Sequence, residues 1–119
     1  MANEIKVTSG LSCTNVNLKV PSTTATNQFN QTTARGGTIC ADIGTSEETI
    51  AFGDVAPGWV EMVNTDATNY VQVGFSTAVY GMRLLAAKGS ATFYLESGAT
   101  IYAKANTATC IVQITAINA

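Results

Sequence analysis

The stretch that decides the fold runs from residue 60 to residue 117 and contains VEMVNTDATNYVQVGFS (60–76) and MRLLAAKGSATFYLESGATIYAKANTATCIVQITAI (82–117). Apolar and polar residues alternate through it in short runs, separated by turn-forming Gly, Asn, Asp and Ser. In the last run, Cys110, Val112 and Ile114 share one side of the expected strand, and the residues between them share the other. This period of two is typical of strands that press one face against a core.

The beginning of this stretch predicts a β-hairpin. Residues 59–63 and 70–75 both alternate, and Asn, Thr and Asp dominate the turn at 64–69. The side chains of these turn residues bond local backbone groups and tolerate left-handed conformations. Residues 82–85 predict the next strand, followed by a turn in which Gly89 stands where we expect a positive φ.

Outside this stretch, residues 13–20, 38–43 and 49–52 also predict strands, and no segment keeps a helical pattern over ten residues. About eight to ten short strands, with turn signals every 8–12 residues or so, are typical of antiparallel sandwiches and small barrels. The sequence therefore predicts one all-β domain over residues 1–119, an antiparallel β-sandwich of the jelly-roll kind.

Two segments near the N-terminus are expected to make contacts outside this sandwich. Residues 1–10 predict an edge strand or an arm, and residues 22–37 form a polar stretch rich in Thr, Asn and Gln. Loops longer than about 12–15 residues are uncommon in compact domains and are usually functional or disordered. Phe29 either anchors this loop against a neighbour or packs on its own domain. The candidate interface residues are Ile5, Val7, Phe29 and Arg35.

The composition favours a protein whose surface is partly covered by partners. Hydrophobic residues make up 46% of the chain and charged residues only 12%. Folded protein surfaces usually carry roughly 25–35% charged residues. A chain so poor in charge is expected to be a subunit of an assembly.

Charge and hydropathy exclude other classes of partner. The net charge is −2 and the pI about 4.8, with the six basic residues scattered, so we expect no nucleic-acid partner. No apolar run approaches the roughly 18 residues of a membrane span. The N-terminal MANEIKVTSG lacks a basic region followed by an apolar run, so we expect synthesis in a cytoplasm and no membrane partner.

The residues offer little catalytic or metal chemistry. The chain has no His, and its three cysteines, Cys13, Cys40 and Cys110, have no C-x-x-C spacing. A reducing compartment disfavours a disulfide among them, and Cys110 is expected to be a small buried hydrophobe. The adjacent acids Glu47 and Glu48 are typical of a solvated turn rather than of an acid–base pair. We therefore expect no catalytic residue, no cofactor and no metal site, and a protein that is not an enzyme.

Four aromatic residues fall on strand faces opposite the expected core. Such a set forms a carbohydrate-stacking surface, the protein-facing side of an interface, or a second core layer if the sheet is covered on both faces. These residues are Trp59, Tyr70, Tyr94 and Tyr102.

The strand and turn residues of the second half resemble small structural proteins of tailed bacteriophages. The resemblance covers about half of the chain, and each of its motifs is a generic strand-and-turn pattern. Its residues are Gly58-Trp59-Val60-Glu61-Met62-Val63-Asn64-Thr65-Asp66, Asn69-Tyr70-Val71-Gln72-Val73-Gly74, Arg83-Leu84-Leu85, Gly89 and Ile101-Tyr102-Ala103-Lys104-Ala105. It implies a non-enzymatic virion component with a β-sandwich fold that packs as a homo-oligomer or on a capsid. The family usually has Pro or Leu before the late turn, where this chain has Ala86-Ala87-Lys88.

On this resemblance we expect a capsid decoration or cement protein that binds the major capsid protein or other virion proteins and stabilises the head lattice. We expect a homotrimer or another homo-oligomer, located in the virion and made in the host cytoplasm. The alternative is a tail-associated or host-recognition module that binds glycans through the aromatic residues.

Overall fold

The structure is a computed structural model of the 119-residue chain and describes residues 4–21, 24–53 and 55–118. Within these residues the protein is all-β, with twelve strands and no helix. The chain divides into two compact units, Met1–Thr33 and Ala34–Ala119. The sequence predicted a single domain over 1–119; among the described residues, none of the first unit is part of the buried core cluster of the second.

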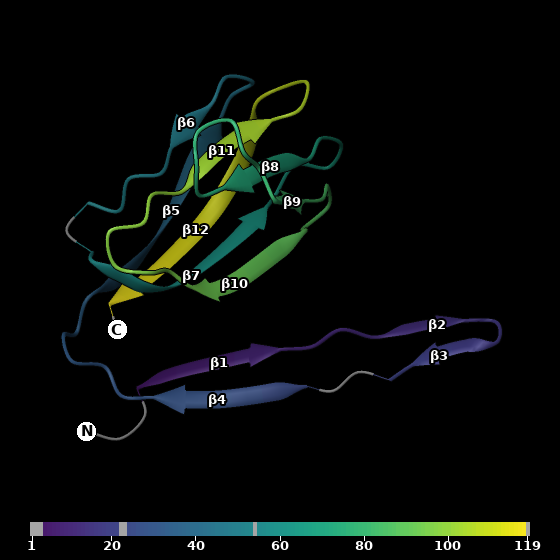
Figure 1. The fold of residues 1–119 in the computed structure, drawn as a ribbon, viewed down its shortest axis with the longest axis horizontal. Helices are drawn as coiled ribbons and strands as arrows, with labels where there is room; N and C mark the ends of the chain where they lie inside the picture. The colour runs from purple at the N-terminus through teal and green to yellow at the C-terminus, as the bar shows by residue number, and fades with distance from the viewer. Residues whose placement is uncertain (1–3, 22–23, 54, 119) are drawn as a thin grey trace. The chain divides into compact units, whose positions relative to one another are not determined.

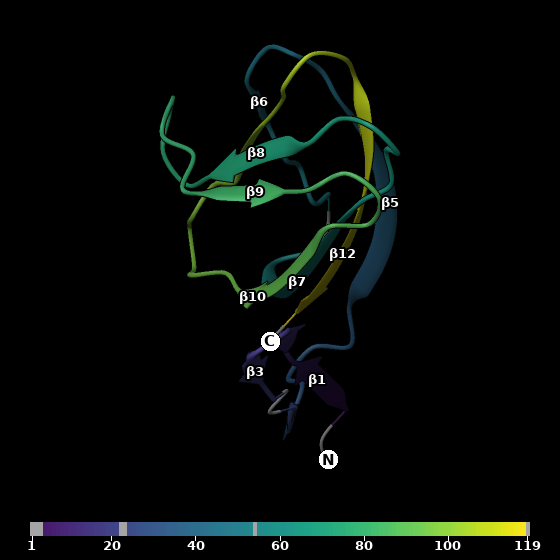
Figure 2. The same cartoon turned by 90° about the vertical axis from the view of Figure 1, so that its right-hand side faces the viewer.

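The larger unit is a sandwich of two four-stranded antiparallel sheets, with strand orders β10-β7-β12-β5 and β6-β11-β8-β9 (Figure 1, Figure 2). Its strands are β5 (Gly36–Ile43), β6 (Glu48–Thr49), β7 (Pro57–Asn64), β8 (Val71–Gly74), β9 (Met82–Leu84), β10 (Ser90–Tyr94), β11 (Tyr102–Ala105) and β12 (Cys110–Asn118).

The strands of the sandwich pair in nested order. The first strand of the sandwich, β5, pairs with the last, β12. The second pairs with the second last, and so on inward, which gives β6 with β11, β7 with β10 and β8 with β9. Two further ladders, β7 with β12 and β8 with β11, join these pairs into sheets. This is the rolled-up arrangement of a jelly roll, so the expected fold class is confirmed.

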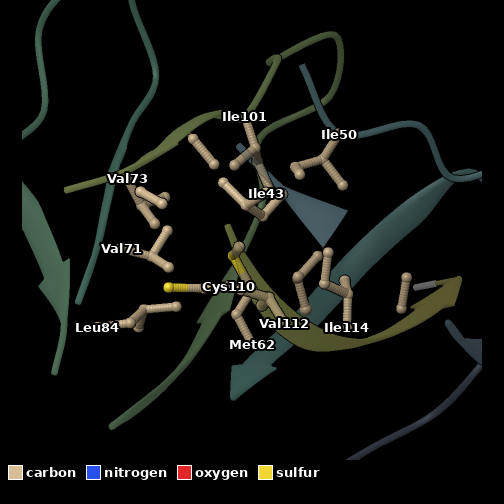
Figure 3. Close-up of a cluster of buried hydrophobic side chains, with 14 of the residues drawn as sticks. Ile43, Ile50, Met62, Val71, Val73, Leu84, Ile101, Cys110, Val112 and Ile114 are labelled. Carbon is tan, nitrogen blue, oxygen red and sulfur yellow. The ribbon is translucent and has the colours of Figure 1, made fainter. Parts of the chain in front are cut away.

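The core lies between the two sheets and follows the alternation in the sequence (Figure 3). On β12 the inward residues are fully buried while Ile111 and Gln113 between them are exposed. The register places Ile114 opposite Met62 of β7, so neighbouring strands bury residues side by side. The largest fully buried apolar side chains of the core are Ile43, Val60, Met62, Val71, Val73, Leu84, Ile101, Cys110, Val112 and Ile114. The expected burial of Cys110 is confirmed.

The hairpin expected from residues 59–63 and 70–75 was wrong. Strands β7 and β8 lie in different sheets, and the connection at 65–70 crosses from one sheet to the other. Alternation shows which face of a strand is buried. It does not show which other strand lies beside it in the sheet, because every strand of the sandwich has one buried face. Sequence spacing alone therefore paired two strands that face each other across the core.

Asn64 joins two connections of the sandwich at the end of β7. It is the buried polar residue among those described, with 0% of its surface exposed. Its Nδ2 donates to the carbonyl oxygens of Asn69, at 2.9 Å, and Leu84, at 3.1 Å, while its Oδ1 accepts from the Asp66 backbone N–H at 3.0 Å. Buried polar groups require such partners. One side chain thus holds the 65–70 crossover against the end of β9.

The turn after β9 uses glycine for a reason other than the expected one. Positive φ values belong to Ala87, at 59°, and Lys88, at 75°. Gly89 is required by close approach instead, since a Cβ there would lie 2.3 Å from the Leu85 backbone nitrogen. The need for glycine comes from tight packing of the turn on itself.

The smaller unit consists of two antiparallel strand pairs. β1 (Ile5–Ser9) pairs with β4 (Ala25–Phe29), and β2 (Cys13–Asn15) pairs with β3 (Leu18–Val20). Within 1–10, the strand is β1, and residues 1–3 lie outside the described residues.

Two expectations for this unit differ from the structure. Residues 13–20 form a hairpin rather than one strand, because the chain reverses at Val16, whose φ is +49°. The polar stretch 22–37 is not one loop, since it contains β4 and the start of β5; residues 22 and 23 lie outside the described residues. All five residues of β4 are exposed, so this strand carries no apolar alternation that would reveal it.

Candidate assembly interface

The first unit holds large apolar side chains in the open. Among its described residues only Ile5 is buried. Leu11 and Val16 are each 85% exposed, and Leu18 and Val20 are about half exposed. We call residues 4–33 the arm. These exposed apolar side chains make the arm the candidate interface of the chain.

Backbone bonding, not a core, gives the arm its shape. Five residue pairs form the β1–β4 ladder, from Ile5 opposite Phe29 to Ser9 opposite Ala25. The Glu4 carboxylate accepts the Gln31 backbone N–H at 3.0 Å and so closes one end of the ladder. The β2–β3 hairpin is likewise a short ladder, of three residue pairs, and its Leu18 and Val20 are about half exposed.

The four predicted interface residues are only partly brought together. Ile5, Val7 and Phe29 share one face of the β1–β4 ladder, because Phe29 is the register partner of Ile5. Ile5 is buried at 3% exposure, Val7 is half-buried and Phe29 is exposed. Arg35 belongs to the second unit, where its carbonyl oxygen accepts the Asn118 backbone N–H at 3.0 Å.

The most exposed apolar residues of the arm were not among those predicted. Val16, Leu18 and Val20 alternate, and alternation in a single strand predicts a core-facing set. In the structure Leu18 and Val20 share one face of the β2–β3 hairpin, with Thr14 and Lys19 on the other. The signal that could have separated them from core residues is the two-residue turn at Val16 and Asn17.

The sandwich carries an apolar hollow of its own at the ends of β8 and β9. Its volume is about 410 Å³, and its walls include Phe75, Val79 and Met82. Phe75 is 52% and Val79 61% exposed. The Phe75 ring meets Phe93 edge-to-face with centroids 5.8 Å apart, which fixes its orientation.

The loop that forms the outer wall of this hollow is held in place from two sides. At Gly74, an added Cβ would lie 1.9 Å from the Val79 carbonyl oxygen, so the loop packs directly on the strand backbone. The Glu47 carboxylate accepts the Ala78 backbone N–H at 2.6 Å and the Tyr80 hydroxyl at 2.5 Å. These bonds lower the pKa of Glu47, with the Tyr80 hydroxyl as the main cause, and raise the pKa of Tyr80 to about 12.

The predicted aromatic surface is divided between the two sheets. Trp59 and Tyr94 are register partners on the outer face of β7 and β10, with ring centroids 5.3 Å apart at 85°. Tyr102 lies on β11 of the other sheet and Tyr70 directly precedes β8, where the Arg83 guanidinium lies 4.0 Å from the Tyr70 ring centroid. The four rings therefore form no common platform.

Other kinds of site find little support in the part of the chain that the structure describes. Residues 4–21, 24–53 and 55–118 contain no group of three or more His, Cys, Asp or Glu that could hold a metal ion. Cys13 and Cys40 are free and exposed, and burial raises the pKa of the free thiol of Cys110. No described helix is long and apolar enough to span a membrane.

A scan against known protein families found no match, and a search of curated proteins found none either. Among solved structures, one that is similar comes from work titled "Bacillus endospore appendages form a novel family of disulfide-linked pili". The sequences are 17% identical, the TM-score is 0.38, and the match covers 76% of this chain and 93% of that chain. A likeness this distant carries no argument about function.

Proposed function

We propose that this chain is a non-enzymatic structural subunit whose arm binds a neighbouring subunit and so links copies into an assembly. The observation that carries the proposal is the contrast between the two units. The sandwich buries a continuous core, whereas the arm leaves Leu11, Val16, Leu18 and Val20 exposed. Water-exposed aliphatic side chains on a ribbon without a core gain free energy when a partner covers them.

The size of this gain indicates what kind of assembly is expected. Fully burying an aliphatic side chain is worth about 1.5–3 kcal/mol, so covering the exposed parts of these four yields roughly 4–8 kcal/mol. Association of two proteins costs an estimated 4–15 kcal/mol in lost freedom of motion. One arm contact alone is therefore weak. Copies that each give and receive an arm gain stability from several contacts at once.

Arms passed from each copy to the next around an assembly make a heterologous contact, whereas two copies that exchange arms make an isologous dimer. Heterologous contacts close into rings when the rotation between copies permits and otherwise give open polymers. A homotrimer is the smallest such ring. We propose a closed ring or another homo-oligomer of this kind.

The resemblance to phage structural proteins leads us to propose a bacteriophage head as the setting, with the oligomer acting as a decoration or cement protein on the capsid lattice. The low charge content of 12% supports a subunit with much covered surface. Purified protein added to capsids that lack it should bind at a fixed ratio and raise the temperature at which the shells open. Absence of binding would remove this setting but leave self-association untouched.

Self-association is tested by the mass of the full chain in solution. Leu18→Asp places a charge on the apolar face of the β2–β3 hairpin, whereas Thr14→Asp places the same charge on its opposite face. Light scattering after gel filtration should show an oligomer for the natural chain and Thr14→Asp, and a monomer for Leu18→Asp. Equal masses for all three proteins would refute the proposal.

A second candidate function, glycan binding, rests on the Trp59–Tyr94 pair alone, since Tyr94 is 53% exposed beside the Trp59 ring. Aromatic faces of this kind stack on sugars. Binding on a glycan array that disappears in both Trp59→Ala and Tyr94→Ala, with the fold retained, would favour it. No binding by the natural chain would exclude it for the glycans tested.

A further inference from the structure

The sandwich leaves an apolar surface uncovered in a form suited to receiving side chains. Strand β9 is the edge of its sheet, so the hollow beside it is open to a partner. Of the residues that line it, Ser76 alone has a polar side chain. A volume of about 410 Å³ lies within the roughly 300–1,000 Å³ typical of ligand sites. The hollow therefore has room for several side chains of a strand turn.

The hollow exists before any partner arrives. Its outer wall, the loop at 75–81, rests on Gly74 without space for a Cβ and is fastened to Glu47 by two hydrogen bonds. Within the loop, the Val79 backbone N–H donates to the Ser76 carbonyl oxygen at 3.1 Å. A surface already in its bound shape pays less ordering entropy on association. Phe75 and Val79 thus remain exposed in a fixed arrangement.

The same chain supplies a group that matches the hollow. The tip of the β2–β3 hairpin presents Val16 and Leu18, which are 85% and 54% exposed. The walls of the hollow expose apolar side chains as well, with Phe75 52% and Val79 61% exposed. Contact between two copies would cover both.

Charge also favours this pairing over pairing between like units. Residues 1–33 carry two basic residues and one acidic residue, a net charge of +1, whereas residues 34–119 carry four basic and seven acidic residues, a net charge of −3. Arm against sandwich therefore brings opposite charges together, and sandwich against sandwich brings like charges together. Complementary charge raises the rate and the specificity of association.

We propose that the hollow lined by Phe75, Val79 and Met82 receives the tip of the β2–β3 hairpin from a second copy of this chain. The inference rests on the proposed function, because it names the surface on which the arm binds. Aliphatic side chains of the tip enter the hollow, and the Phe75 ring, held by Phe93, forms one side of their contact.

Cross-linking between different copies tests this contact. In a background with Cys13→Ser and Cys40→Ser, one copy carries Leu18→Cys and a second, heavier tagged copy carries Val79→Cys. Mild oxidation of the mixture should give a mixed dimer at least tenfold more abundant than with a second copy that carries Thr92→Cys, an exposed position on the outer face of the other sheet. Equal cross-linking at both positions overturns the proposal. A copy carrying both Leu18→Cys and Val79→Cys that links only within itself overturns it as well.

The assembly itself gives a second readout that separates this inference from the proposed function. Val79→Asp should weaken association at least tenfold, which corresponds to about 1.4 kcal/mol, while Thr92→Asp should leave it unchanged. Retained thermal unfolding shows that each variant is folded. If Leu18→Asp abolishes assembly and Val79→Asp does not, the arm binds elsewhere and the hollow is excluded. If neither variant changes assembly, both proposals fail.

Discussion

Replacement of Asn64 is the sharpest test of how the sandwich is held together. The side chain is fully buried and bonds four backbone groups, from the 65–70 crossover and from the end of β9. The longest bond, 3.3 Å to the Leu85 carbonyl oxygen, shares the two Nδ2 hydrogens with two shorter bonds and adds little to the stability. Asn64→Ala removes all four bonds without disturbing the alternation of β7. The variant therefore isolates the contribution of one polar side chain inside an apolar core.

The expected loss follows from the surroundings of each partner. The Leu84 carbonyl is bonded in a buried position, and leaving such a group without a partner costs about 1–3 kcal/mol. The groups on Asp66 and Asn69 are half-buried, so water replaces part of their bonding and each costs about 0.5–1 kcal/mol. The free energy of unfolding should fall by roughly 2–5 kcal/mol, which for this chain length lowers Tm by about 8–20 °C.

Thermal and urea unfolding followed by circular dichroism measure this loss. Gln113→Ala is the matched control, because it removes an exposed amide from the outer face of β12 and should change stability by less than about 0.5 kcal/mol. Asn64→Asp should be less stable than Asn64→Ala at pH 7, and should recover at pH 4 as a protonated carboxyl regains a donor. An Asn64→Ala variant within 2 °C or so of the natural Tm would refute the reasoning, given the size of the expected loss.

The other predictions concern the loop beside the hollow and the buried thiol. Gly74→Ala should lower Tm and loosen the loop, seen as faster proteolysis at 75–81, because its Cβ meets the Val79 carbonyl oxygen at 1.9 Å; an unchanged Tm would contradict the packing. The pKa of Glu47 is lowered from 4.5, so its bonds stabilise the loop above that pH and are lost as pH falls through the lowered value; Glu47→Gln should abolish this acid sensitivity of proteolysis. One of the four tyrosines should titrate near pH 12 in ultraviolet absorbance and shift down in Glu47→Gln, whereas identical titrations would exclude the Tyr80 bond. Cys110 should resist alkylation until the sandwich unfolds, and equal rates for Cys110 and Cys13 would contradict its burial.

The sequence predicted which residues of each strand face the core better than it predicted which strands pair with each other. Alternation assigned Val112 and Ile114 to the core because burial of one face requires a period of two. Alternation could not show that β7 pairs with β10 rather than with β8, because β8 and β10 both alternate apolar and polar residues. The nested pairing depends on contacts between strands far apart in the chain. The pattern within one strand does not indicate which distant strand pairs with it.

The arm escaped prediction for the opposite reason. Local patterns assume that an apolar side chain finds a core in its own domain. This assumption fails for Leu18 and Val20, because the β2–β3 hairpin that carries them leaves both about half exposed. The polar β4 gave no strand signal either, although its backbone pairs fully with β1. The candidate site therefore became visible only when exposure and apolar character could be compared residue by residue.

Hydrogen exchange of the full chain at low and high concentration tests the central claim, that the arm joins one copy to another. Mass spectrometry measures exchange in separate peptides from the arm, from the loop at 75–81 and from strand β10. On raising the concentration, backbone amides at 11–20 should become protected as oligomers form, while those of β10 should not change. Unchanged exchange in the arm of an oligomer would contradict the account.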